Sequence, residues 1–178
     1  MAPFPLGATG LTVLVPEAEP LVAGPRSRFD VAAQFGMPAH VTVLYPWLPR
    51  DELGADDLDG VRSLARASAP FEAVLARTAR FPRTLWLDPR PADRFRALTE
   101  AVALRWPQAQ PYGGEFETVV PHLTVAHEQP EEVLAEVAAE VSAALPVTFS
   151  ATALALHEFD GVRWLERDRF TFGAARPE

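Results

Sequence analysis

The segment HVTV at residues 40–43 returns almost unchanged as HLTV at residues 122–125. In each copy a histidine and a threonine stand two residues apart in an apolar run. Because side chains alternate between the two faces of a β-strand, the histidine and threonine of each copy share one face and the apolar residues share the other. The sequence therefore predicts two strands, each with an apolar back and a front that carries one imidazole and one hydroxyl.

Phosphodiester cleavage can use these four polar side chains. A base must deprotonate the attacking water or hydroxyl, an acid must protonate the departing oxygen, and donors must hold the phosphoryl oxygens. An imidazole titrates near pH 6.5, so of two neighbouring histidines one can be neutral while the other is protonated. We predict that His40 and His122 are the acid and the base, and that Thr42 and Thr124 hold the phosphate. This chemistry requires no metal and no cofactor.

A competing interpretation is purely structural. Threonine favours strands, and a half-buried histidine can be satisfied by a backbone carbonyl, so all four side chains could be ordinary strand residues. The same argument applies more strongly to His157, which stands alone in an apolar segment and is expected to be structural. A zinc site on His122 and His127 is not supported, because a spacing of five places the two side chains on opposite faces of a strand.

Composition limits the partners. The 178 residues, of which 48% are hydrophobic, suffice for one domain over residues 1–178 or for two small lobes that share a core. The net charge of −8 argues against a protein that neutralises a long run of phosphates, so we expect a small nucleotide or RNA end as substrate and no long duplex. No long apolar window and no basic signal-peptide start are present. We expect a cytoplasmic monomer with no membrane partner.

Two missing residue types narrow the chemistry further. The chain has no cysteine, which excludes thiol nucleophiles, disulfides and thiolate metal sites. It also has no lysine, since all 16 basic residues are arginine. A lysine-adenylate ligase, a Schiff-base enzyme and a Walker-type nucleotide site each need the lysine amine, and all three are therefore excluded.

Hydrophobic periodicity and turn residues predict helices and strands that alternate along the chain. The predicted strands are 11–15, the first motif, 71–81, 84–89, the second motif, 147–159 and 162–172, with a hairpin turn at Asp160-Gly161. The predicted helices are 26–35, 51–67, 92–106 and 131–145, the third with Phe95, Leu98, Val102 and Leu104 inward. A helix and paired strands recur after each motif, which indicates an internal duplication. Two similar lobes would then set the two motif strands side by side.

Six further residues are candidates for substrate contact. Tyr45 and His127 each follow a motif histidine by five residues, and regular alternation would turn them away, but both lie at strand ends where alternation can fail. Trp86 and Trp164 follow Arg83 and Arg163, pairings that could stack a base and hold a phosphate. Packing is the alternative for Tyr45, and core burial is the alternative for both tryptophans.

The paired motifs resemble those of the 2H phosphoesterase superfamily, particularly its 2′-5′ RNA ligase-like members. The resemblance covers nearly the whole chain and includes the first strand ending at Pro16, LWLDP at 85–89 and GVRWLERDRFTFG at 161–173. It implies a bilobal α+β fold in which two antiparallel sheets form a central cleft, with helices packed outside. It also implies metal-independent action on 2′,3′-cyclic phosphates or 2′-5′ linkages. In some members an aromatic residue at the position of His127 contacts the substrate.

Residues and resemblance together predict a phosphodiesterase that uses two histidines. The alternative is a catalytically silent module that binds an RNA end or a nucleotide. Binding alone would not require two proton-transfer groups, so the intact histidine in both motifs favours the enzyme.

Overall fold

The computed structural model describes residues 3–115 and 118–174. The strands are β1 (Thr9–Leu14), β2 (His40–Leu44), β3 (Phe71–Phe81), β4 (Thr84–Arg90), β5 (Leu123–His127), β6 (Val147–Ala151), β7 (Ala153–Phe159) and β8 (Trp164–Thr171). The α-helices are α1 (Glu19–Phe29), α2 (Val31–Gln34), α3 (Ala55–Ala67), α4 (Ala92–Arg105) and α5 (Glu131–Ser142), and the short 3₁₀ turns are η1 (Pro16–Ala18) and η2 (Pro111–Gly114).

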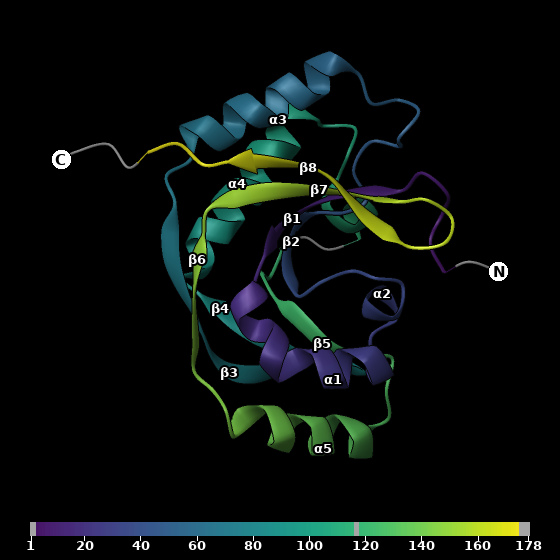
Figure 1. Cartoon of the computed structure of the whole chain (residues 1–178), viewed down its shortest axis with the longest axis vertical. Coiled ribbons are helices and arrows are strands. Elements are labelled where there is room, and N and C mark those ends of the chain that lie inside the picture. Colours follow the sequence, from purple (N-terminus) through teal and green to yellow (C-terminus); the bar gives the residue numbers. More distant parts are fainter. Residues whose placement is uncertain (1–2, 116–117, 175–178) are drawn as a thin grey trace.

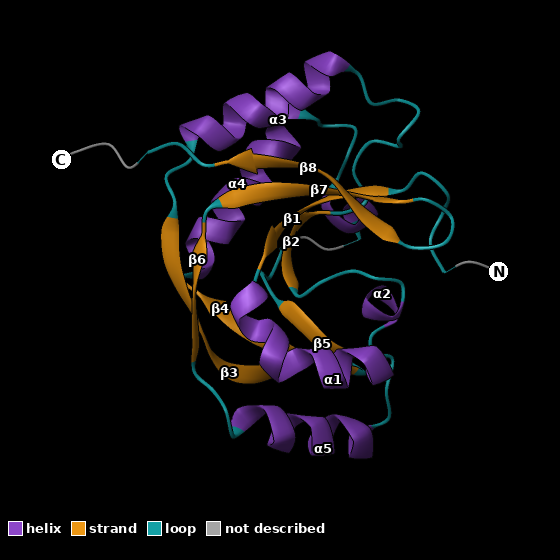
Figure 2. Cartoon of the chain, viewed as in Figure 1, coloured by secondary structure: helices purple, strands orange, loops and turns teal. Residues whose placement is uncertain are grey.

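The strands form two four-stranded antiparallel sheets, with helices packed outside them. The first sheet has the order β2-β1-β7-β8 and the second the order β5-β4-β3-β6. In Figure 2, α3 and α5 lie at opposite ends of the molecule with the strands between them. This arrangement confirms the predicted α+β class with two antiparallel sheets. Each motif strand is an edge strand of its sheet, and β2 and β5 contact each other near the centre of the molecule (Figure 1).

Helices α1 and α4 each connect two strands of one sheet but pack against the motif strand of the other sheet. Helix α4 connects two strands of the second sheet but packs against β2 of the first, where the Thr99 hydroxyl donates to the Val43 carbonyl over 2.8 Å. Helix α1 connects two strands of the first sheet but packs against β5 of the second. Each motif strand is therefore backed by a helix from the other half of the molecule, and one continuous apolar core joins both sheets.

Helix positions follow the predictions with two corrections. The helix predicted from residue 26 begins at Glu19, and it ends before Asp30, whose extended backbone and side-chain bond to the Ala32 amide (3.1 Å) start α2. Leu104, predicted to point inward, is 85% exposed. It lies nine residues after the buried Phe95, which at about 100° per residue places it on the opposite side of α4.

The predicted strand at 147–159 is two strands in different sheets. β6 pairs with β3 in the second sheet, and β7 pairs with β1 in the first, so the chain crosses between the sheets at Thr152. The hairpin between β7 and β8 is confirmed, because the Asp160 amide donates to the Arg163 carbonyl (3.1 Å) and Gly161 takes the left-handed conformation that such a turn needs. No helix among the described residues combines the length and the apolar character needed to cross a membrane.

Candidate active site

Both motif strands show the predicted alternation. Their apolar residues are buried, with exposed fractions of 2% or less, and the motif histidines and threonines are partly exposed. The buried set consists of Val41, Val43, Leu123 and Val125. The polar front of each strand is therefore open to a ligand, and its apolar back belongs to the core.

An extra residue interrupts the pairing of β1 with β2. Thr12 pairs with Thr42, but the next pair joins Leu11 to Leu44, so Val43 has no partner and forms a β-bulge. Val43 and Leu44 are both buried, as expected when the bulge turns two successive side chains toward the core.

The same bulge occurs in the second motif strand. Trp86 pairs with Thr124, the next pair joins Leu85 to Ala126, and Val125 is the unpaired residue. The two motif strands therefore share a register irregularity at the same place, directly after the motif threonine.

The bulges decide where Tyr45 and His127 point. Because each bulge adds one residue, both side chains return to the face of the motif histidines. The Tyr45 ring lies over Gly10, and a Cβ atom on residue 10 would be only 3.3 Å from that ring. The Thr84 hydroxyl and His127 Nδ1 are 3.0 Å apart. Regular alternation thus fails at both positions, which leaves Tyr45 and His127 on the motif face.

The two motif histidines are held in the same way. His40 Nδ1 lies 2.8 Å from the Pro38 carbonyl oxygen, and His122 Nδ1 lies 2.7 Å from the Val120 carbonyl oxygen. A carbonyl oxygen can only accept, so each Nδ1 must carry the hydrogen. Each neutral ring then presents Nε2 as a free proton acceptor, the form that a general base requires.

Both histidines favour the neutral form. Burial lowers the pKa of His40 to about 3, helped by the positive charge of Arg26 and by His157 and His122. Burial and the nearby His127 also lower the pKa of His122. The strands that carry the two rings, β2 and β5, contact each other, which places His40 and His122 on neighbouring strands. The direction of both pKa shifts favours the neutral form of each ring near neutral pH when no phosphate is bound.

The turn η2 links the two halves of the site. The Tyr112 amide donates to the Tyr45 carbonyl over 2.8 Å, which joins η2 to the end of β2. The Tyr112 ring stacks on His122 with centroids 6.3 Å apart and an angle of 23° between the planes. Tyr112 thereby supports the second motif histidine from the side of the first.

Trp86 forms a wall beside His122. Its indole is 7% exposed, stacks on Phe81 at 4.7 Å and meets the His122 ring at 5.9 Å and 65°. Phe81 approaches His122 edge-on at 5.2 Å. Trp86 is thus at the site, and its neighbours cover most of its surface.

The other candidates lie elsewhere. Arg83 is in the turn between β3 and β4, where its Nε is 2.9 Å from a Glu128 carboxylate oxygen, next in sequence to His127. Trp164 is 5% exposed and packs with Phe4, Phe159 and Tyr45, so it belongs to an aromatic core cluster and offers no open face. Arg163 is exposed in the β7–β8 turn.

His157 is a buried neighbour of the site. It is 1% exposed, its Nδ1 lies 3.3 Å from the Thr12 hydroxyl, and burial lowers its pKa to about 4. Within the described chain its Nε2 has no hydrogen-bond partner. These contacts agree with the expected structural role.

Two groups of charged residues were missed by sequence reasoning. Arg26 is 2% exposed, forms an ion pair with Asp30 (2.8 Å) and adds a positive charge near His40. On β3 and β4, Asp88 binds Arg77 and Arg90. An arginine on a helix is usually exposed, so the sequence contained no indication that Arg26 is buried. Asp88 and Arg90 are two residues apart on a strand, and this spacing already indicated that they share one face.

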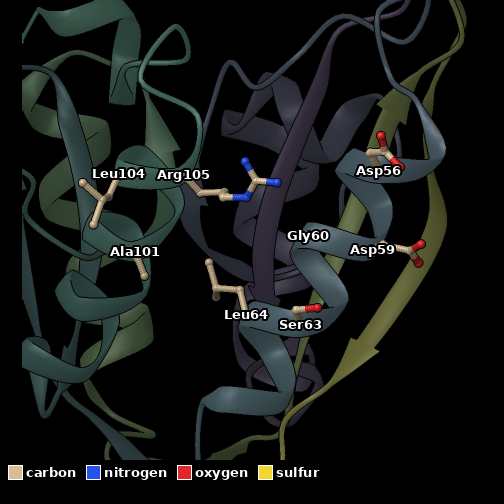
Figure 3. Close-up of a pocket in the computed structure, with 8 residues that line it drawn as sticks. All are labelled: Asp56, Asp59, Gly60, Ser63, Leu64, Ala101, Leu104 and Arg105. Atoms are coloured by element: carbon tan, nitrogen blue, oxygen red, sulfur yellow. The ribbon is translucent and has the colours of Figure 1, made fainter.

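A separate hollow lies on the outer side of the first sheet. It measures about 750 Å³ and lies between α3 and α4, where Arg105 reaches across the gap toward Gly60 (Figure 3). Helix α4 packs on the apolar back of β2, so this hollow is separated from the motif residues by the sheet. Within residues 3–115 and 118–174, no group of three or more histidine, aspartate or glutamate side chains could hold a metal ion.

Comparison with known proteins identifies the class. Two antiparallel sheets, each with a histidine-threonine strand at its edge, make up the fold of a 2H phosphoesterase. The family model of the 2′-5′ RNA ligase superfamily matches residues 14–163, which include both motifs, and the chain belongs to this superfamily. No curated protein sequence matches it.

Solved structures share the fold over nearly the whole chain. TT0787 of Thermus thermophilus is 22% identical, with a TM-score of 0.62 over 95% of this chain and 100% of its own. E. coli LigT complexed with NADP+ is 17% identical, with a TM-score of 0.57 over 96% of this chain and 99% of its own. A phosphoesterase with a TM-score of 0.59 is 16% identical and covers 95% of this chain and 99% of its own. At these identities the likeness shows the fold alone.

Proposed function

We propose that this protein hydrolyses a phosphodiester in a small RNA-like substrate, either a 2′,3′-cyclic phosphate or a 2′-5′ linkage, with His40 and His122 as the proton-transfer pair. The observation that carries the proposal is the matched geometry of the two rings. Each donates Nδ1–H to a backbone carbonyl and leaves Nε2 free, and each ring is partly exposed. The superfamily of phosphoesterases to which the chain belongs supports the same reaction type.

In the proposed step one histidine Nε2 takes a proton from water as the water oxygen bonds to phosphorus. The bond between phosphorus and the ribose oxygen breaks, and the protonated Nε2 of the other histidine gives its proton to that oxygen. A cyclic phosphate plus water thus becomes a phosphomonoester beside a free hydroxyl. The assignment of acid and base between His40 and His122 stays open.

The threonines would hold the phosphate during this step. Thr42 and Thr124 share the face of the histidines and are partly exposed, and within the described residues neither hydroxyl has a hydrogen-bond partner. Both hydroxyls are therefore available to donate to non-bridging oxygens. A negatively charged phosphate would also raise the pKa of each nearby histidine, which would let one of them carry the proton that the leaving oxygen needs.

Nucleotides are the substrate class that the relatives suggest. E. coli LigT has been crystallised with 3′-AMP, with ATP and with NADP+. Of these, 3′-AMP is a nucleoside with a phosphomonoester beside a free 2′-hydroxyl, which is one of the two products that opening a 2′,3′-cyclic phosphate would give.

The test is a substrate panel with identified products. Purified protein is incubated with 2′,3′-cyclic nucleotides, ADP-ribose cyclic phosphate and 2′-5′ dinucleotides, with and without EDTA, beside the double variant His40→Ala/His122→Ala. We expect turnover of at least one class by the wild type and none by the variant. Binding without turnover by the wild type would instead establish the silent nucleotide-binding module, and turnover that EDTA abolishes would contradict the metal-independent step.

A further inference from the structure

Asp88 lies on the same face of the second sheet as the motif residues. It stands two residues after Trp86 on β4, and Trp86 pairs with Thr124 and contacts His122. The last pair of this register joins Leu87 to Leu123, and the register continued by one residue would set Asp88 opposite His122. Strand geometry places Asp88 about 7 Å along β4 from Trp86.

Asp88 holds two arginines. Arg77 Nε lies 2.8 Å from Asp88 Oδ2, and Arg90 donates to the same oxygen from Nε at 3.0 Å and from its terminal nitrogen at 2.9 Å. The carboxylate is 4% exposed, whereas the arginine side chains are 67% and 57% exposed. Burial alone would raise the pKa of Asp88, but the hydrogen bonds and charges of Arg90 and Arg77 outweigh it and hold that pKa below its ordinary value. The carboxylate thus stays charged and fixes both guanidinium groups at the surface.

This cluster has a surplus of positive charge and of donors. Two guanidinium groups share one carboxylate, which leaves a net charge of +1 in a chain whose total is −8. Each guanidinium has five N–H donors, and Asp88 engages at most two of each group. Within the described chain the remaining donors have no protein partner and face solvent. An arginine fork with free donors is suited to a phosphate oxygen pair.

The first sheet has no such cluster at the matching place. There His40 pairs with Leu14, which corresponds to Asp88 when the register of β4 with β5 is continued by one residue. The two motif strands are alike in their histidine, threonine and bulge but differ in this neighbour. The positive charge near His40 belongs to Arg26, which is 2% exposed and paired with Asp30, whereas the guanidinium groups of Arg77 and Arg90 are exposed and open to a second phosphate of a substrate.

We propose that Arg77 and Arg90, positioned by Asp88, bind a second phosphate of the substrate, adjacent to the phosphate that is cleaved. This inference rests on the proposed function and narrows its substrate class. The preferred substrate carries at least two phosphates, as in an RNA end of two or more nucleotides or a cyclic nucleotide with a 5′-phosphate.

The experiment compares three substrates with the same reacting group: a nucleoside 2′,3′-cyclic phosphate with a free 5′-hydroxyl, the same compound with a 5′-phosphate, and a dinucleotide that ends in the cyclic phosphate. We expect Arg77→Ala and Arg90→Ala each to lower kcat/KM on one or both two-phosphate substrates by about tenfold, mainly through KM, because each removes a charged hydrogen bond. Activity on the one-phosphate substrate should stay unchanged. A lower kcat/KM on the 5′-phosphorylated compound indicates that a terminal phosphate is bound, and a lower kcat/KM on the dinucleotide indicates that a bridging phosphate is bound.

The matched control is Arg28→Ala, which removes an exposed arginine on α1 that pairs with Glu140 and changes the net charge equally. Arg77→Lys, which keeps the charge but loses the fork, should fall between the wild type and Arg77→Ala. Both test arginines are exposed, and each single variant leaves Asp88 one partner, so folding should be retained. The double variant is avoided because it would leave a buried carboxylate unpaired.

The outcomes separate this inference from the proposed function. Absence of turnover on all three substrates would reject the proposed function. Turnover of all three with no preference for a second phosphate, or Arg77→Ala and Arg90→Ala that match Arg28→Ala on every substrate, would overturn the inference while leaving the proposed function intact.

Discussion

At the scale of single residues, the site depends on two backbone carbonyls. The Pro38 and Val120 carbonyls each accept from the Nδ1 of the histidine two residues later and so select its tautomer. Burial and nearby positive charge lower the pKa of both rings and so favour their neutral form near pH 7 when no ligand is bound. A protonated acid therefore has to be produced by low pH or by a bound anion.

This requirement sets the pH dependence. The free enzyme needs one protonated histidine, and both pKa values lie below 6.5, so kcat/KM should rise as pH falls from 8 toward about 5. The decline of kcat should occur at a higher pH than the decline of kcat/KM, because the bound phosphate raises the pKa of both rings. Steady-state rates on a 2′,3′-cyclic nucleotide across pH 4–9 check this. A kcat/KM that climbs between pH 7 and 9 would contradict it.

The two threonines allow a conservative test. Thr42→Val and Thr124→Val keep shape and strand preference but remove the hydroxyl that is expected to donate to the phosphate. We expect each to lower kcat/KM by about 10- to 100-fold, the cost of one lost hydrogen bond to a charged group. Thr148→Val, an exposed strand threonine on β6, serves as the control. Rates within error of the control in both variants would remove the threonines from the site.

At the scale of elements, the two bulges do most to shape the site. They place Tyr45 and His127 on the motif face, which a strict period of two could not predict. A local signal existed, because the apolar pairs Val43-Leu44 and Val125-Ala126 each break the alternation directly after the threonine. Two successive buried residues at the end of an alternating strand indicate a bulge.

Other features depend on contacts that local sequence does not encode. The segment 147–159 contains no proline or glycine, and nothing in its pattern shows that Thr152 divides it between two sheets. The exchange of α1 and α4 between the sheets is likewise set by packing over long sequence distances. By contrast, the strands predicted at 71–81 and 84–89 and the helix that follows Pro91 could be read from the prolines and the hydrophobic spacing, and the structure differs only by one residue at the end of β4 and at the end of α4.

The contact of α4 with β2 can be tested through Thr99. This side chain is 4% exposed and donates to the Val43 carbonyl at the bulge. Thr99→Val should lower the free energy of unfolding by about 1–2 kcal/mol, because it leaves a buried carbonyl oxygen without its donor. Urea unfolding measures this, with the exposed Thr171→Val as the control. Equal stability of the two variants would show that this bond does not hold the helix to the motif strand.

At the scale of the whole molecule, the repeated bulge supports the predicted duplication. In both sheets the motif strand is at the edge, its neighbour is the strand that precedes it in the same half, and the register shift falls at the same step. The origin of the two lobes by duplication stays a prediction. The halves also differ next to the motif, because His40 pairs with Leu14, whereas the register of β4 with β5 continued by one residue sets Asp88 opposite His122.

The buried histidines make the whole fold sensitive to acid. The pKa of His157 is about 4 in the folded chain and near 6.5 when unfolded, so the unfolded state binds more protons between these values. Stability is therefore lost as pH falls from 6.5 to 4, with about 3 kcal/mol from His157 at pH 4. Urea unfolding at pH 6.5 and at pH 4 measures this. The free energy of unfolding should fall less between these two pH values in His157→Gln than in the wild type. Parallel curves for the two proteins would contradict this account.

The central claim, that one motif histidine is the acid and the other the base, is tested most directly by the leaving group. Rates of His40→Ala and His122→Ala are measured on a 2′,3′-cyclic nucleotide and on a nucleoside nitrophenyl phosphodiester, whose leaving group departs without a proton. The rate of both variants on the cyclic nucleotide should be about 10²–10⁴-fold below that of the wild type. On the nitrophenyl ester, the rate should return toward the wild-type value only in the variant that lacks the acid. Wild-type rates for either variant on the cyclic nucleotide, or equal losses on both substrates for both variants, would contradict the claim.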